Sequence, residues 1–385
     1  MESVEEKFKA LSIARRIQPS EPTYLLDMSV QSVSGSGPGL LAVCCSNRSI
    51  HLHCKDNLSL LGEYQGHGGL LCGVSFAHRS PDLLFSGSAD GTVRTWDVRR
   101  PGSEAVQVFR SDPYHHFCSF DVSCNDEVLC AGTEQVDGED SFLVFWDVRM
   151  TKENSCGVLG VYSESHSDDI TQVRFHPSNK DRLASGSTDG LVNVFDLSQG
   201  SEEEALMATC NSGSSASSVC WAGKDLNQLL CLSHDEGMHL WDLGQIDTNE
   251  PLTVFGTPDA RSLTPLSDGR PLDYLVRGMW LEEEQCLLVL GGENSGDLHV
   301  LECSGKGLRL VKSLHGGHSA MVRCFVWDPE GGALFSGGED AQLLLWKPGA
   351  QELTSGKRDT LKSGSALKLK SRPHKKHGYK KREEA

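Results

Sequence analysis

The feature that most constrains the fold is a short segment that recurs along the chain with fixed internal spacing. Its clearest copies are Leu84–Asp97, Leu183–Asp196 and Leu334–Lys347. In each copy an Asp lies six residues before an aromatic residue, and a Ser lies ten residues before it, without gaps. Each copy also has small residues and an Asp turn between two apolar runs, which is typical of a β-hairpin. A repeated β architecture is therefore predicted.

Weaker copies of the segment fill the intervals between the clear ones. The anchor positions, where the aromatic or its equivalent stands, are then residues 53, 96, 146, 195, 241, 301 and 346, spaced by 43 to 60 residues. Alternating apolar and polar side chains, as in Val192–Val194, indicate strands, and no helical periodicity continues after about residue 15. Seven such units predict an all-β protein with few helices.

Three units carry a His before their first strand, and two of these, His67 and His318, follow Gly. Together with the anchors, these residues resemble the WD-repeat family over roughly residues 22–347. The resemblance implies a seven-bladed β-propeller. In that family a His, a Ser, an Asp and a Trp form a buried hydrogen-bonded tetrad. By position, the sets here would be His67–Ser86–Asp90–Trp96, His318–Ser336–Asp340–Trp346, and His166–Ser185–Asp189 with Phe195.

The chemistry of these sets favours architecture over catalysis. Phe195 supplies no indole N–H, so the His166 set is expected to be weaker, and the four other blades are expected to rely on packing. Ser, His and Asp also form hydrolase triads, but a nucleophile would be single and raised on an exposed turn. No catalytic residue and no enzyme activity are therefore predicted. His51 and His53 share one face of a strand without a third ligand nearby, so no metal or other cofactor is expected.

A propeller must close its ring, because an open blade leaves a strand edge unpaired. The alternating segment Leu11–Ile17 is predicted to pair with the blade that contains Leu334–Trp346, which lacks an outer strand of its own. The segment Phe255–Leu272, with three Pro, is predicted to be a surface insertion. The predicted organisation is an N-terminal closing segment at 1–21, a propeller at 22–350 and a basic disordered tail at 351–385.

Charge is distributed unevenly along the chain. The formal net charge is −17, yet residues 351–385 hold eleven Lys or Arg and four Asp or Glu, so that residues 1–350 carry −24. An acidic body attracts basic proteins and disfavours direct contact with nucleic acid, which only the tail would make. The prediction is a monomeric, non-catalytic scaffold of the nucleus or nucleolus and the cytoplasm. Its partners would be basic proteins of the histone or ribosomal type.

An alternative function is a substrate receptor of a cullin-RING ubiquitin ligase. Trp-Asp-Val-Arg occurs at residues 96–99 and 146–149, and it matches the Trp-Asp-x-Arg box of such receptors. The same tetrapeptide is a common way to end the third strand of a blade, so both interpretations remain open. The residues that would contact the ligase adaptor are Asp97, Arg99, Asp147 and Arg149.

The tail carries a basic cluster, which is typical of a nuclear localisation signal and could instead contact RNA or the acidic body. The cluster comprises Lys375, Lys376, Lys380, Lys381 and Arg382. No apolar run reaches the roughly 18 residues that a membrane span needs. The fourteen cysteines include no Cys-x-x-Cys pair and are expected to be reduced thiols of an intracellular protein.

Overall fold

The computed structural model describes residues 4–18, 23–32, 38–102, 104–111, 115–150, 157–244, 251–263, 266 and 269–352. The chain divides into two units, Met1–Leu353 and Thr354–Ala385. The basic cluster of the tail, and almost all of the segment expected to be disordered, therefore lie outside the described residues. The architecture that follows is that of the first unit.

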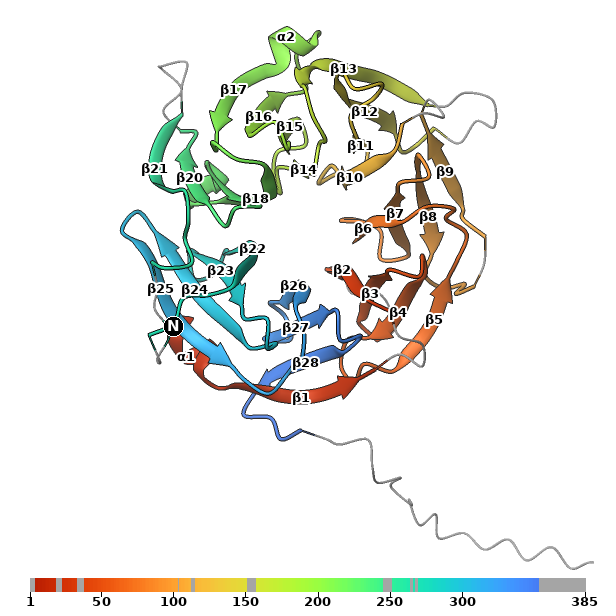
Figure 1. The fold of residues 1–385 in the computed structure, drawn as a ribbon. Helices are drawn as coiled ribbons and strands as arrows, with labels where there is room; N and C mark the ends of the chain where they lie inside the picture. The colour runs from red at the N-terminus through yellow and green to blue at the C-terminus, as the bar shows by residue number, and fades with distance from the viewer. Residues whose placement is uncertain are drawn as a thin grey trace, which may run out of the picture. The chain divides into compact units, whose positions relative to one another are not determined.

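Seven four-stranded antiparallel sheets form a closed ring, so the chain is a seven-bladed β-propeller (Figure 1). Blade 1 contains β2 (Leu25–Val30), β3 (Leu40–Cys45), β4 (Ile50–Cys54) and β5 (Leu60–Tyr64). Blade 2 contains β6 (Leu71–Phe76), β7 (Leu83–Ser88), β8 (Thr92–Asp97) and β9 (Gln107–Arg110). Blade 3 contains β10 (Phe117–Val122), β11 (Val128–Thr133), β12 (Ser141–Asp147) and β13 (Val158–His166).

The remaining blades follow the same order, from the inner strand to the outer one. Blade 4 contains β14 (Gln172–Phe175), β15 (Arg182–Gly186), β16 (Leu191–Asp196) and β17 (Leu206–Asn211). Blade 5 contains β18 (Ala216–Ala222), β19 (Gln228–Ser233), β20 (Met238–Asp242) and β21 (Leu252–Thr257). Blade 6 contains β22 (Tyr274–Leu281), β23 (Cys286–Gly292), β24 (Leu298–Ser304) and β25 (Gly307–Leu314). Blade 7 contains β26 (Val322–Asp328), β27 (Ala333–Gly338), β28 (Leu343–Pro348) and β1 (Leu11–Ile17).

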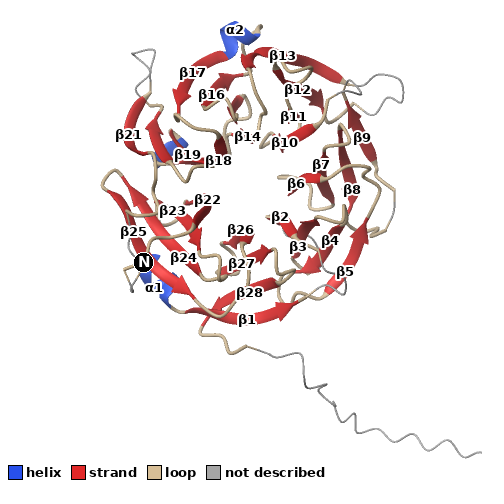
Figure 2. Ribbon diagram, viewed as in Figure 1, coloured by secondary structure: helices blue, strands red, loops and turns tan. Residues whose placement is uncertain are grey.

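Helix is scarce among the described residues (Figure 2). The elements are α1 (Val4–Lys9), α2 (Glu202–Ala205) and the 3-10 turn η1 (Lys224–Leu226). Neither α-helix has the length or the apolar run that crossing a membrane requires. Every described cysteine is a free thiol.

The core lies between blades rather than within one of them. One cluster joins Phe109 of blade 2 to Phe117 and Trp146 of blade 3. The small residues of the repeat allow this packing, because a side chain at Gly87 would meet the ring of Phe120 in the next blade at 2.5 Å. The sequence places a small residue where two blades approach most closely.

The ring is closed by a strand from the other end of the chain. β1 pairs antiparallel with β28, from Leu11 opposite Pro348 to Ile17 opposite Leu343. Immediately before β1, α1 places Phe8 in the core between blades 6 and 7, where its side chain is 0% exposed. Segments more than 320 residues apart in sequence thus complete one sheet.

One expectation about a loop was wrong. The segment Phe255–Leu272 is not simply a surface insertion, because it begins inside β21 and buries Ala260, Leu266 and Leu272 in a core cluster of blades 5 and 6. The helix α2 begins after Ser201, whose hydroxyl accepts a hydrogen bond from the Glu204 N–H.

Candidate functional site

Blade 2 contains a hydrogen-bonded set of four side chains. His67 Nδ1 lies 3.0 Å from Asp90 Oδ2, and His67 Nε2 lies 2.8 Å from Ser86 Oγ. The Trp96 indole N–H donates to the same hydroxyl at 2.8 Å. An indole only donates and an ionised carboxylate only accepts, so Ser86 accepts from Trp96 and His67 Nδ1 donates to Asp90.

Blade 7 repeats this geometry. His318 Nδ1 lies 3.1 Å from both carboxylate oxygens of Asp340, and its Nε2 lies 2.8 Å from Ser336 Oγ. The Trp346 indole N–H donates to Ser336 at 2.9 Å. The turn that carries each Asp is therefore tied to two strands of its own blade and to the loop that enters it.

Hydrogen bonding governs the acidity of these aspartates. Burial alone would raise the pKa of Asp90, but hydrogen bonds from His67, Thr92 and the Gly68 N–H outweigh it and hold that pKa well below the ordinary range. The pKa of Asp189 and that of Asp340 are also lowered, again by hydrogen bonds that outweigh burial. All three carboxylates are consequently ionised acceptors at neutral pH.

The serine hydroxyls of these sets cannot meet a substrate. Ser86, Ser185 and Ser336 are each 0% exposed, and their hydroxyls are occupied within the sets. A serine nucleophile needs an exposed oxygen that can approach a carbonyl. The geometry is therefore that of a structural network.

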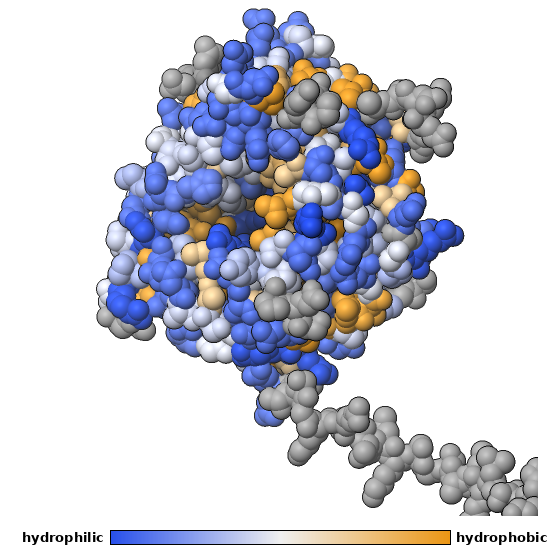
Figure 3. Space-filling model, turned by 45° about the vertical axis from the view of Figure 1, so that its right-hand side comes forward, coloured by the Kyte–Doolittle hydropathy of each residue, from blue (hydrophilic) through white to orange (hydrophobic). Residues whose placement is uncertain are grey.

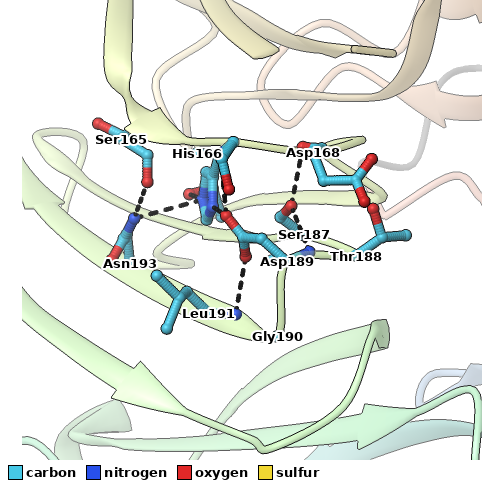
Figure 4. A network of polar contacts seen from close by, with 12 residues as sticks. Ser165, His166, Asp168, Ser187, Thr188, Asp189, Gly190, Leu191 and Asn193 are labelled. Carbon is cyan, nitrogen blue, oxygen red and sulfur yellow. Dashed lines mark hydrogen bonds and ion pairs between the residues drawn. The ribbon is translucent and has the colours of Figure 1, made fainter. Parts of the chain in front are cut away.

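The His166 set in blade 4 keeps its contacts although it ends in Phe195 (Figure 4). His166 Nδ1 lies 2.9 Å from Asp189 Oδ2, and its Nε2 lies 2.7 Å from Ser185 Oγ. Asn193 adds an amide to the network, because its Nδ2 donates to the Ser165 carbonyl at 2.7 Å and lies 3.4 Å from His166 Nε2. A side-chain amide therefore joins the network of the blade that lacks the indole.

Replacement of each serine by Ala is expected to show how much each of the three sets contributes to the free energy of unfolding. Ser86 and Ser336 each bond two partners, whereas Ser185 bonds only His166. The Ser86→Ala and Ser336→Ala variants should lose about 2 kcal/mol of unfolding free energy, and Ser185→Ala about 1 kcal/mol less than that. Urea titration would measure the difference, and equal losses at all three positions would contradict it.

Blade 6 contains a polar network that sequence reasoning assigned to packing. His299 Nε2 lies 3.0 Å from Glu293 Oε1, its Nδ1 lies 2.9 Å from Ser313 Oγ, and Arg270 pairs with Glu293 at 3.0 Å. His299 stands two positions before its anchor, as Asn193 does. That position is polar in five of the seven units: His51, Arg94, Asn193, His239 and His299. The polar character of this position is visible in the sequence, but no single residue type marks it.

His51 and His53, which share one face of a strand, both contact other groups of the protein. His51 Nε2 lies 3.0 Å from Ser49 Oγ, and His53 Nδ1 lies 3.0 Å from the Leu58 carbonyl oxygen. Within the described residues, no group of three or more His, Cys, Asp or Glu side chains is placed to hold a metal ion.

Mild acid should destabilise the ring through its buried histidines. Burial lowers the pKa of His53 to about 4, and burial also lowers the pKa of His51, His239 and His299. Between that value and an unfolded pKa near 6.5, the unfolded chain binds more protons, so stability falls as pH decreases. His53 alone should cost about 1 kcal/mol at pH 5.5. Urea titrations at pH 7.5 and 5.5 should show a smaller loss in His53→Gln than in the native chain.

The arginines of the two Trp-Asp-Val-Arg segments occupy equivalent, exposed positions after β8 and β12. Arg99 binds Asp97 through Nε and Nη2, both at 2.8 Å, and Arg149 binds Asp147 through the same atoms at 2.9 Å. Their side chains are 65% and 62% exposed. The Arg99 hydrogen bond lowers the pKa of Asp97 to about 2, so this ion pair persists in mild acid.

The same fork also occurs outside these segments. Arg261 binds Asp259 through Nε at 3.0 Å and Nη2 at 2.8 Å, with no tryptophan beside them in sequence. The fork is therefore a local feature of Asp-x-Arg turns, and it does not by itself mark a partner site.

The inner strands of all seven blades line a central cavity of about 700 Å³, visible as a hollow in Figure 3. Its charged side chains connect blades. Asp27 pairs with Arg277 at 3.1 Å and accepts the Val74 N–H at 3.2 Å, and Asp121 accepts the Phe175 N–H at 2.7 Å. Asp27 and Asp121 therefore have structural partners in other blades.

A family model described as WD domain, G-beta repeat matches residues 58–97, 158–196 and 308–347. Each match begins at or near the outer strand of one blade, which is β5, β13 or β25. Each ends at the third strand of the next blade, which is β8, β16 or β28. One sequence repeat therefore spans two blades and joins them covalently.

The chain is also similar to proteins of other organisms over most of its length. It is 27% identical to the WD repeat-containing protein 89 homolog of Dictyostelium discoideum, over 84% of this chain and 82% of the relative. It is 29% identical to WD repeat-containing protein GTS1 of Arabidopsis thaliana, over 80% and 78%. It is 23% identical to the serine-threonine kinase receptor-associated protein of Gallus gallus, over 84% and 79%.

Proposed function

Because this chain is a seven-bladed WD-repeat β-propeller, we propose that it is a non-catalytic scaffold that binds basic proteins through an acidic surface. Propellers of this kind are generally interaction scaffolds, and one relative is named for its association with a receptor. The observation that carries the proposal is the charge of −24 on residues 1–350. Such a charge speeds the encounter with cationic partners and opposes binding of nucleic acid to the ring.

Partners of the histone or ribosomal type have the required charge. Binding of this kind weakens as salt screens the charges. Immobilised full-length protein should retain purified core histones or ribosomal proteins at low salt and release them at about 0.5 M salt. An acidic protein of similar size to these basic proteins, applied to the same immobilised chain, serves as the negative control. Failure to retain any basic protein at low salt would reject the proposal.

The tail is proposed to direct the protein to the nucleus, as a function separate from binding by the ring. Replacement of Lys375, Lys376, Lys380, Lys381 and Arg382 by Gln in the full-length chain should move a fluorescent fusion from the nucleus to the cytoplasm. Unchanged distribution would show that these residues are not the signal.

The second candidate function is that of a receptor for a cullin-RING ubiquitin ligase. It is favoured by the equivalent, exposed placement of Arg99 and Arg149 in adjacent blades. The double replacement of Arg99 and Arg149 by Ala should abolish co-purification of the ligase adaptor. Arg261→Ala is a matched control, because it removes the same fork elsewhere. Adaptor binding that survives the double replacement would exclude this role for the two arginines.

A further inference from the structure

Two tryptophans from adjacent blades line one pocket of about 370 Å³, separate from the tetrads. Trp280 lies at the end of β22, before the turn into β23, and Trp327 lies at the corresponding place in β26. Both rings are partly buried and held in place. The Trp280 indole N–H donates to Glu282 at 3.0 Å, and the Trp327 ring lies 4.9 Å from that of Phe8.

The pocket is bordered by more negative than positive charge. Glu282, Glu283 and Glu284 line it from the turn between β22 and β23. Lys7 pairs with Glu284, and more weakly with Glu283 at 3.5 Å. The Glu283 side chain remains 78% exposed. The nearest arginine, Arg277, is already paired with Asp27. The glutamates therefore retain an excess of negative charge next to two aromatic rings.

The adjoining turn of blade 7 extends this acidic surface. Asp328 and Glu330 lie beside the neighbouring central cavity, which Trp280 and Trp327 also line. Lys55 pairs with both, at 3.2 and 3.3 Å. One lysine between two carboxylates again leaves a surplus of negative charge. The two turns together thus form an acidic border around the two indoles.

We infer that this pocket receives an arginine or lysine side chain of a basic partner, which deepens the proposed function and rests on it. A cation is attracted to the face of an indole ring, and the attraction grows when the site is partly shielded from water. The aliphatic stem of such a side chain packs on apolar surface while its charge stays at the acidic border. An anionic ligand would meet the glutamates and be repelled.

The test uses the full-length chain and a fluorescein-labelled Arg-Gly peptide, with the citrulline version of the peptide as a neutral control. The arginine peptide should bind and change tryptophan emission, whereas the citrulline peptide should not. The double replacement of Glu282 and Glu283 by Gln should raise Kd about three- to thirtyfold. Trp327→Phe should lose less affinity than Trp327→Leu, since it keeps an aromatic face. Glu203→Gln, on the exposed side of α2, is the matched control.

The outcomes separate the pocket from the general function. Peptide that binds the double Gln variant as tightly as the native chain would overturn the pocket and leave the acidic scaffold intact. No binding of the arginine peptide to either the native chain or the tail variant would overturn the pocket, whereas the proposed scaffold is rejected only if basic proteins are not retained at low salt. If the peptide binds only after the tail residues Lys375, Lys376, Lys380, Lys381 and Arg382 are changed to Gln, the tail competes with the peptide, and the inference that the pocket is open to a partner in the native chain is overturned. Thermal unfolding of each variant distinguishes lost binding from lost fold.

Discussion

Removal of residues 1–18 is expected to lower the melting temperature by about 10 °C or more. The deletion strips the outer strand from blade 7 and leaves the edge of β28 open. It also removes the buried Phe8 and Leu11 from the core between blades 6 and 7. Loss of two large apolar side chains and a strand of backbone hydrogen bonds should cost at least about 5 kcal/mol.

The deletion also removes the hydrogen bonds of Arg16. Its Nη1 donates to the Gly317 carbonyl at 2.7 Å and to Gln342 Oε1 at 2.8 Å, so β1 also holds the loop that enters blade 7. Differential scanning calorimetry would compare the deletion with a chain that lacks only residues 1–3. A melting temperature within 2–3 °C of the native value would show that closure by β1 is dispensable.

The second large effect is expected at Asp90. Asp90→Ala removes the acceptor for His67 Nδ1 and for the Gly68 and Thr92 N–H groups. His67, in the loop that enters blade 2, and Thr92, at the start of β8, are both buried, so leaving their donors unpaired should lower the free energy of unfolding by about 3–5 kcal/mol. Urea denaturation at pH 7 would measure the loss.

Asp189→Ala and Asp340→Ala should lower the free energy of unfolding by a similar amount. Each carboxylate accepts a hydrogen bond from the His of its own set and from the backbone N–H of the residue after that His. Glu203→Ala, in an exposed position, should change stability by less than about 0.5 kcal/mol. A loss at Asp90 no larger than that at Glu203 would contradict a stabilising role for the network.

Much of the fold could be predicted because the repeat reports on local structure. The spacing between Asp90 and Trp96 reflects a hairpin, and a hairpin is encoded by neighbouring residues. Seven anchors then gave seven blades. The prediction of a surface insertion at Phe255–Leu272 was wrong, because it rested on prolines, which are typical of surface loops. Leu266 and Leu272 are instead buried against residues distant in sequence.

The pocket at Trp280 and Trp327 could not be predicted for a related reason. Its two tryptophans come from units about 47 positions apart, and only the packing of adjacent blades brings them together. The role of Asn193 was hidden differently, since the position two residues before the anchor holds His or Arg in four other units and Val or Leu in the remaining two. A pattern of polarity without residue identity is difficult to recognise in a single sequence.

The pairing of β1 with β28 has a consequence for how the chain is made. The ribosome produces β1 first, and its partner follows after about 330 further residues. At a synthesis rate of about 5–20 residues per second, β1 waits about 15–65 seconds for that partner. During this interval an apolar strand and Phe8 are left without their final contacts. The edge of β1 is therefore open to other strand partners until blade 7 closes.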